Sequence, residues 1–189
     1  MSDLSRGRKT HELERGFTLI EMLIVVVIVG ILAALLIPQF VTSIQKAKQK
    51  GSMQDMNGLA KAIVDYITDV GFAPEQSGPL VVGSTFVEKI RPFYAKAIPL
   101  IDQWGTAFNI YCGTAIDAAG LGGISATGPD DFVIISYGRD KQQTSFSFDP
   151  MDPQTSYFDL TSLPDFNHDL VIWNGSWVHA PKGGQLGQH

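Results

Sequence analysis

The sequence contains a single cysteine, Cys112, among 189 residues. One thiol cannot form an intramolecular disulfide, so the fold cannot depend on such a bridge. Cys112 follows the run Asn109-Ile110-Tyr111, where we expect a buried strand residue rather than a nucleophile. An excess of basic residues is also missing, because the formal net charge is −5. This charge argues against a nucleic-acid partner.

The residue patterns of common catalytic sites are absent as well. No serine stands in a recognisable nucleophile elbow. The glycine-rich run Gly120–Gly123 has neither phosphate-loop spacing nor a following lysine. No metal-ligand spacing relates the four histidines, which are His11, His168, His179 and His189. We therefore predict that the protein is not an enzyme.

The sequence does contain a long apolar run, from Phe17 to Ile37, with Glu21 as its only charge. A helix over these residues would be roughly 31 Å long at about 1.5 Å per residue, which matches the hydrocarbon core of a bilayer. We predict a transmembrane helix over residues 17–38. A carboxylate inside such a helix costs a few kcal/mol, order of magnitude, so Glu21 should have a partner or a function.

Residues 1–16 form a short charged leader, with four Lys or Arg against three Asp or Glu. A secretory signal peptide would end in small residues after the apolar run, but Pro38-Gln39-Phe40 stands there. The basic leader is expected on the cytoplasmic side and the rest of the chain outside. Lys46, Lys48 and Lys50 are then a solvated helix face.

The leader and the following Gly16-Phe17-Thr18-Leu19-Ile20-Glu21 resemble the type IV prepilin signature. The resemblance implies that a prepilin peptidase cleaves after Gly16, that Phe17 is N-methylated, and that Glu21 guides assembly. Gly30 and Pro38 stand where that family often has helix-loosening residues. Cleavage would free an α-amine, with a pKa of about 7.7–8.0, which could pair with Glu21 of another subunit. A plain signal-anchor helix is the alternative interpretation.

After Pro38 the helical pattern continues as one apolar stripe to about Val70, and Gly71 is a plausible helix end. Strand-like runs follow at 107–111, 132–137, 170–173 and 176–179, with a hairpin turn at Asn174-Gly175 and a short helix at 86–96. We predict an α+β, type IV pilin-like fold, with the long helix packed on a small antiparallel sheet. The predicted divisions are a leader (1–16), a transmembrane and filament-core helix (17–38), a periplasmic globular domain (39–180) and a flexible tail (181–189).

Four later segments are similar to the major pseudopilins of type II secretion systems: Gly71–Leu80, Asp102–Phe108, Ser136–Asp140 and Asp169–Asn174. The resemblance implies a structural subunit of a helical periplasmic filament that helps export folded proteins across the outer membrane. Its partners would be further copies of itself, the prepilin peptidase, the inner-membrane secretion platform and minor pseudopilins. A type IV pilus subunit for adhesion, motility or DNA uptake is the alternative, although many such pilins carry a disulfide that this chain cannot form.

The resemblance further implies Ca²⁺, held near the loop that follows the Ser136–Asp140 segment. Asp140 and Asp169 are the first candidate ligands and Asp165 is the next, because calcium prefers several hard oxygen atoms. Two stretches, 113–131 and 142–168, read as insertions relative to the compact family form. The second insertion either meets a neighbouring subunit or packs on its own sheet.

Overall fold

The structure, a computed structural model, describes residues 16–182 and divides into two units. The N-terminal unit ends at Phe40 and the globular unit begins at Val41, and each is described by itself. Helix α1 (Leu19–Val70) contributes to both units. Most of the predicted leader and residues 183–189 of the predicted tail lie outside the described part. Pro181 and Lys182 do not: Pro181 is buried and forms a β-bridge with Phe158.

The predicted extent of the long helix is confirmed to within two residues. α1 ends where the sequence indicated, because the Gly71 N–H donates to the Ile67 carbonyl at 2.7 Å and Gly71 has φ +88°. Glycine adopts this left-handed conformation without strain, which closes the helix. Within the globular unit, the middle of the apolar stripe is buried, including Met53, Met56 and Ile63, whereas Ile44 and Val70 at its ends are exposed.

The remaining elements form an antiparallel sheet with short helices around it. The sheet has five strands in the order β1-β2-β3-β4-β5, each paired with its neighbour in the chain. The elements are β1 (Ser77–Pro79), α2 (Thr85–Ile90), β2 (Asn109–Cys112), α3 (Ala115–Ala119), β3 (Phe132–Ser136), two 3₁₀ helices η1 (Pro153–Ser156) and η2 (Leu163–Asn167), β4 (Leu170–Trp173) and β5 (Ser176–His179).

This arrangement confirms the α+β, pilin-like fold. The bounds predicted for β4 and β5 are those observed, and Asn174 and Gly175 both have positive φ, as their two-residue turn requires. The helix predicted at 86–96 is shorter than expected. It ends at Ile90 because Arg91 precedes a proline and is extended, with φ −90° and ψ 150°.

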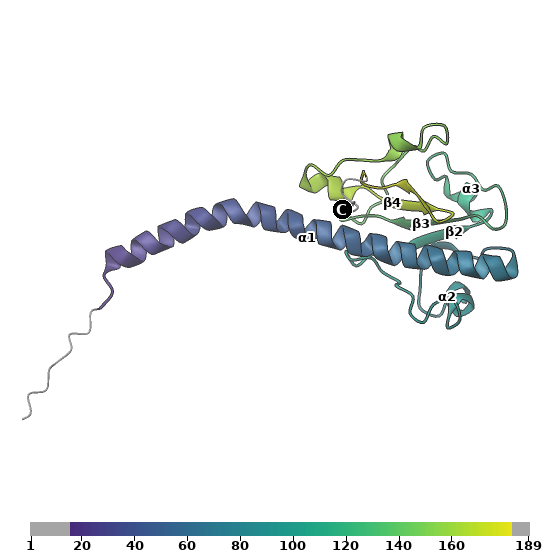
Figure 1. The fold of residues 1–189 in the computed structure, drawn as a ribbon, viewed down its shortest axis with the longest axis horizontal. Helices are drawn as coiled ribbons and strands as arrows, with labels where there is room; N and C mark the ends of the chain where they lie inside the picture. Colours follow the sequence, from purple (N-terminus) through teal and green to yellow (C-terminus); the bar gives the residue numbers. More distant parts are fainter. Residues whose placement is uncertain (1–15, 183–189) are drawn as a thin grey trace, which may run out of the picture. The chain divides into compact units, whose positions relative to one another are not determined.

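The sheet is covered on both faces, and Figure 1 shows α1 along one side of the strands and α2 beyond α1. Ile110, Ile134 and Ile172 pack with α1 and α2 in one apolar cluster. The opposite face carries a second cluster, to which the two insertions contribute; its members include Val133, Ile135, Val171, Ile116, Leu121, Ile124, Phe146 and Phe148. β3 is therefore apolar at nearly every position, since neither of its faces meets water.

A turn at Asp102–Thr106 is built around the buried carboxylate of Asp102, which is 3% exposed. Its Oδ1 accepts the N–H groups of Trp104 and Thr106, both at 2.9 Å. Its Oδ2 accepts the Ser136 hydroxyl at 2.7 Å. Asp102 thus joins this turn to the end of β3.

The same turn is fastened to α1. The Gln103 N–H donates to Ser52 Oγ at 3.0 Å, and the Trp104 indole N–H donates to Gln45 Oε1 at 2.9 Å. A Cβ at Gly51 would lie 2.9 Å from Gln103 Cγ, so a glycine there lets the turn approach the helix closely. These contacts link helix, turn and sheet without a disulfide.

We predict that Asp102→Ala lowers the free energy of unfolding of the globular unit by about 3 kcal/mol, because three buried donors lose a charged acceptor. Asp102→Asn should be less damaging, since its amide oxygen can still accept. Urea unfolding of the globular unit measures both variants. Asp130→Ala, which changes an exposed aspartate elsewhere in the globular unit, is the matched control and should stay within about 0.5 kcal/mol of wild type. An equally stable Asp102→Ala variant would contradict the role given to this carboxylate.

Candidate functional site

The first site lies at the start of α1, where Thr18 and Glu21 cap the helix reciprocally. Glu21 Oε2 accepts the Thr18 backbone N–H at 2.9 Å and the Thr18 hydroxyl at 2.8 Å. In return the Glu21 N–H donates to Thr18 Oγ1 at 3.3 Å. This is a capping box, which satisfies N–H groups that a helix start leaves without partners.

Thr18 is the functional residue that the sequence reasoning missed, although the signal was present. Thr18-Leu19-Ile20-Glu21 has the Ser/Thr-x-x-Glu spacing of a capping box directly before an apolar run. The partner expected for Glu21 was a cation on another subunit. The structure gives Glu21 a partner within its own helix as well.

The capping box fixes the direction of the Glu21 carboxylate next to Phe17, the residue that would become the N-terminus. The helix start carries partial positive charge, so it also favours an anion at this position. Phe17 is 76% exposed. Gly30 and Pro38 both lie inside α1, and their predicted helix-loosening role stays a prediction.

The second site lies at the end of β3, where the chain approaches the segment before β4. Gly138 has φ +68°, and a Cβ there would lie 2.8 Å from the carbonyl oxygens of Phe166 and His168. The Arg139 N–H donates to the Phe166 carbonyl at 2.9 Å. This close approach places Asp140 near enough to Asp169 for its charge to raise the Asp169 pKa.

Asp169 is buried, with only 1% of its surface exposed. Burial raises the pKa of the Asp169 carboxyl to about 7. The Thr144 N–H, which donates to Oδ2 at 3.0 Å, lowers this pKa, whereas the charge of Asp140 raises it further. Asp169 Oδ1 and Asn167 Oδ1 are both buried, and neither has a hydrogen-bond partner among residues 16–182. No local pattern singles out Asn167, because the burial of its Oδ1 arises only in the folded chain.

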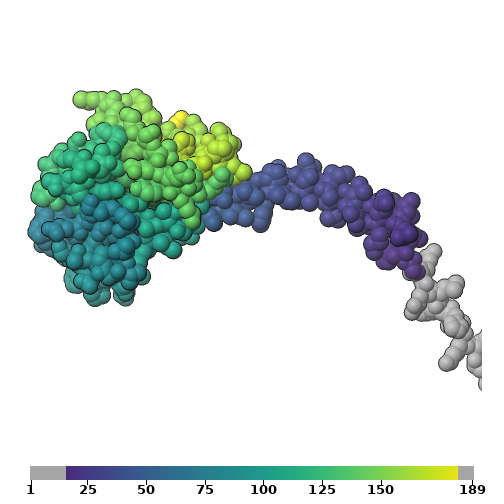
Figure 2. Space-filling view, turned by 180° about the vertical axis from the view of Figure 1, so that it is seen from behind, coloured from purple at the N-terminus to yellow at the C-terminus, as the bar shows by residue number. Residues whose placement is uncertain are grey.

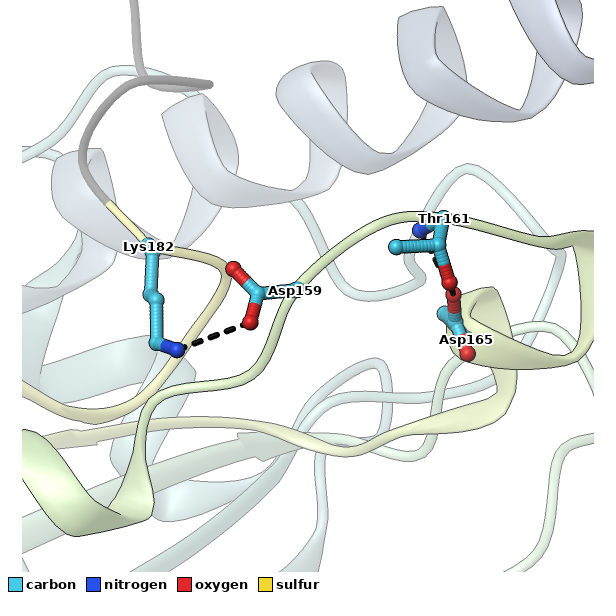
Figure 3. Close-up of polar contacts among 4 residues, drawn as sticks. All are labelled: Asp159, Thr161, Asp165 and Lys182. Carbon is cyan, nitrogen blue, oxygen red and sulfur yellow. Dashed lines mark hydrogen bonds and ion pairs between the residues drawn. The ribbon is translucent and has the colours of Figure 1, made fainter.

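The third expected ligand, Asp165, is directed elsewhere. Its Oδ2 accepts the Thr161 N–H at 2.7 Å, the Thr161 hydroxyl at 2.9 Å and the Ser162 N–H at 2.7 Å, which caps η2. Figure 3 shows the Asp165–Thr161 contact, with the Lys182–Asp159 ion pair nearby. The Ser162 N–H and the other donors lower the pKa of Asp165. In the part of the chain that the structure describes, no three His, Cys, Asp or Glu side chains gather as a metal-binding group.

Residues 13–37 match the model of the prokaryotic N-terminal methylation motif. The type II secretion system core protein G of Dickeya chrysanthemi is 26% identical over 178 residues, which cover 90% of this chain and 94% of that protein. The core protein G of Pseudomonas aeruginosa is 35% identical over 103 residues, which cover 51% of this chain and 72% of that protein. This chain belongs to the core protein G family of pseudopilins.

The chain also resembles a pilin over part of its length. The type IV major pilin protein PilA of Myxococcus xanthus is 40% identical to this pseudopilin, but over 72 residues, which are 33% of each chain. No solved structure matches the chain. Members of the family are structural proteins, in agreement with the prediction that this one is not an enzyme.

A third cluster holds the second insertion of this pseudopilin against its sheet. His179 stacks on Phe146 with ring centroids 5.3 Å apart, and contacts Phe158 at 5.0 Å and His168 at 5.9 Å. Its Nδ1 contacts the Ser156 carbonyl oxygen. Burial lowers the pKa of His179 to about 4, opposed by the Ser156 contact and aided by the charge of His168.

We predict that protonation of His179 destabilises the globular unit as the pH falls. A folded pKa near 4 lies below the ordinary value of about 6.5, so the unfolded chain binds more protons between these values. Stability from this group is complete above about pH 6.5 and is lost on acidification. The melting temperature of wild type, relative to His179→Gln, should therefore fall by a few degrees from pH 7 to pH 5.

Asp169 titrates with the opposite sign in the same range, because its raised pKa favours the folded state at low pH. Only the difference between wild type and His179→Gln therefore isolates the histidine. His168→Gln is the control and should retain most of the pH dependence, since burial is the largest cause of the lowered His179 pKa and His168 only adds to it. Parallel pH profiles for wild type and His179→Gln would refute the assignment.

Proposed function

We propose that this chain is a subunit of a type II secretion pseudopilus, a helical periplasmic filament that helps export folded proteins across the outer membrane. The observation that carries the proposal is the Gly16–Glu21 motif on a capped apolar helix, in a chain similar to core protein G over 94% of a relative's length.

The N-terminal unit supports a membrane location before assembly. α1 is long and apolar enough at this end to cross a bilayer, with a mean hydropathy of 3.1 over its best 18-residue window. Its large apolar side chains, such as Leu19 at 93% and Leu36 at 61%, are exposed to solvent. Lipid would cover them in the inner membrane, with the globular unit in the periplasm. In the filament, the same side chains of neighbouring helices would cover one another.

Processing creates the charge that Glu21 needs during assembly. A prepilin peptidase would cleave after Gly16, and the new α-amine of Phe17 would then be methylated. Because the Thr18 capping box already directs the Glu21 carboxylate, an incoming subunit meets a fixed anion at the apolar helix start. The inner-membrane secretion platform and minor pseudopilins are the further proposed partners.

A type IV pilus subunit is the second candidate function. The 40% identity to the Myxococcus xanthus pilin favours it, but the match covers a third of each chain. Cys112 is buried and free, so this chain lacks the cysteine pair of many such pilins. Burial raises the pKa of the Cys112 thiol to about 12, which leaves it unreactive.

We predict that Glu21→Ala is cleaved and inserted normally but enters filaments at least tenfold less than wild type. The substitution removes the anion that pairs with a neighbour's Phe17 amine, while the apolar helix remains. N-terminal mass spectrometry and sedimentation of filaments measure the two steps separately. Wild type should begin with N-methyl-Phe17.

Gly16→Val is the control for the first step, because a side chain at the cleavage position should leave the protein full length in the membrane. Efficient filament formation by Glu21→Ala would show that the charge pair is dispensable. An intact Met1 terminus on assembled wild-type protein would refute the pseudopilin assignment of residues 1–16.

The Asp140–Asp169 site suits a calcium ion. Asp169 Oδ1 and Asn167 Oδ1 are buried hard oxygens that lack hydrogen donors, and Asp140 adds a second carboxylate. Calcium takes six to eight oxygens, so backbone carbonyls and water would have to complete its shell. Bound there, the ion would neutralise the two carboxylates and tie the long second insertion to the end of β3.

We predict that calcium raises the melting temperature of the globular unit. At 100 times the dissociation constant, binding to the folded state adds about 2.7 kcal/mol, or roughly 5–10 °C for a domain of this size. Asp169→Asn should abolish the rise. Asp165→Asn is the matched control: it removes the η2 cap and lowers both melts, yet should keep the calcium response. Identical wild-type melts in millimolar calcium and in chelator would reject the site.

A further inference from the structure

An apolar groove opens beside α2, on the globular unit. It has a volume of about 430 Å³, and its lining combines apolar side chains with one acidic and one basic residue: Val82, Val87, Pro92, Ile98, Leu100, Glu88 and Arg91. Val82 at its edge is 85% exposed, and Phe93 nearby is 82% exposed. A single exposed apolar side chain is ordinary, but apolar surface exposed beside an apolar groove is a common feature of interaction sites.

Phe93 is held in place although it faces water. Its ring lies edge-on to Tyr94, with centroids 5.0 Å apart, and Tyr94 lies edge-on to Tyr66 of α1 at 5.4 Å. The Tyr94 hydroxyl also donates to Asp69 Oδ2 at 3.1 Å. An aromatic side chain fixed in this way loses little conformational freedom when a partner binds.

The chain segment that forms the groove carries a net positive charge, although Asp69 of α1 lies against Tyr94 beside it. Between Val81 and Ile101 the charged residues are Lys89, Arg91 and Lys96 against Glu88 alone, and all four are exposed. A partner with an apolar tip between acidic residues would therefore complement this surface.

The second insertion of the same chain presents such a tip. Met151 is 94% exposed and stands between Asp149 and Asp152. The Met151 N–H donates to Asp149 Oδ1 at 2.8 Å, and the Asp152 N–H donates to the Asp149 carbonyl at 3.1 Å. The tip is thus a turn that is formed before any partner binds.

The second insertion is acidic, since residues 142–168 contain four aspartates and no lysine or arginine, and one of the four, Asp159, is paired with Lys182. The aromatic side chains before it, Phe146 and Phe148, pack on the sheet face opposite α1, which leaves Met151 outside. In Figures 1 and 2, the green insertion and the blue-green α2 region lie on opposite sides of the globular unit. One copy cannot bring these two surfaces together.

We propose that the Met151 tip of one subunit docks in the α2 groove of a second copy. Met151 enters between Val82 and Phe93, and Asp149 and Asp152 face Lys89 and Arg91. The contact joins two different surfaces, so it is heterologous and can repeat along an open helical filament. It rests on the proposed pseudopilus function and adds the surfaces through which globular units meet.

The test is a cysteine pair, Val82→Cys with Met151→Cys, made in the full chain in cells that carry the native secretion apparatus. Cys112 is buried with a thiol pKa of about 12, so the native cysteine gives no background. Mild oxidation should give a ladder of dimers, trimers and longer products on non-reducing gels. Neither single variant should cross-link to itself, and Glu21→Ala in the pair background should remove the ladder.

The matched control is Ser125→Cys with Met151→Cys, because Ser125 is exposed but lies outside the groove. An equally strong ladder from this pair, dimers from either single variant, or cross-links to a different protein would overturn the proposal. Sedimentation of filaments from the same cells reports the proposed function separately. If filaments form but the cysteine pair gives no ladder, the proposed Met151–groove contact is overturned and the pseudopilus function is not. If wild-type cells form no filaments, both the contact and the pseudopilus function are overturned.

If the cysteine pair itself prevents assembly, charge reversal decides. Lys89→Glu and Asp152→Lys should each lower the sedimented fraction at least twofold, and their combination should return it to the wild-type level. Lys61→Glu, on an exposed part of α1, is the control and should have no effect. If the double variant instead loses sedimented fraction by the combined amount of the two single variants, the proposal is overturned.

Discussion

The apolar side chains at the start of α1 need a cover that their own unit does not provide. From Phe17 to Phe40 they are largely exposed, whereas one side of the second half of the same helix is buried in the globular unit, between Gln49 and Tyr66. Transfer from water stabilises a buried Leu, Ile or Phe by about 1.5–3 kcal/mol, so this segment strongly favours lipid or neighbouring helices. The capping box explains how this segment could hold the Glu21 carboxylate in lipid and among neighbouring helices, because Thr18 donates two hydrogen bonds to it before another subunit binds.

The globular unit solves a different problem, which is to hold long insertions without a disulfide. The Asp102 carboxylate accepts hydrogen bonds from its own turn and from Ser136 at the end of β3. Gln103 and Trp104 of that turn donate hydrogen bonds to α1. The insertions cover the far face of the sheet with side chains such as Phe148 and Ile116, so the sheet has no wet face. Within residues 16–182, Asp169 Oδ1 and Asn167 Oδ1 are among the few buried side-chain atoms without a hydrogen-bond partner, and the proposed calcium ion would stabilise the insertion there.

Local signals in the sequence predicted the elements that depend least on the rest of the fold. α1, its end at Gly71 and the Asn174-Gly175 hairpin follow from periodicity and from residues that suit positive φ. β1 was missed because its three residues, Ser77–Pro79, form a strand only by pairing with β2. α3 was missed because five residues hold too little pattern. At the sites, Glu21 was found from its apolar context, but Asn167 depends on the close approach at Gly138, which no local pattern reveals.

Apolar packing and polar contacts would have different roles in the assembled filament. Packing among the N-terminal helices would supply most of the free energy of assembly, but it is nearly non-directional and would allow one helix to slide along another. The proposed charge pair between Phe17 and Glu21 would fix the position along the helix axis, yet it would leave rotation about that axis free. The proposed contact between globular units would restrict this rotation. The proposed contact between globular units consists of one methionine and a few exposed ion pairs, and each such ion pair contributes about 0–1 kcal/mol. A contact this weak would set the orientation of neighbouring subunits and still allow the filament to dissociate.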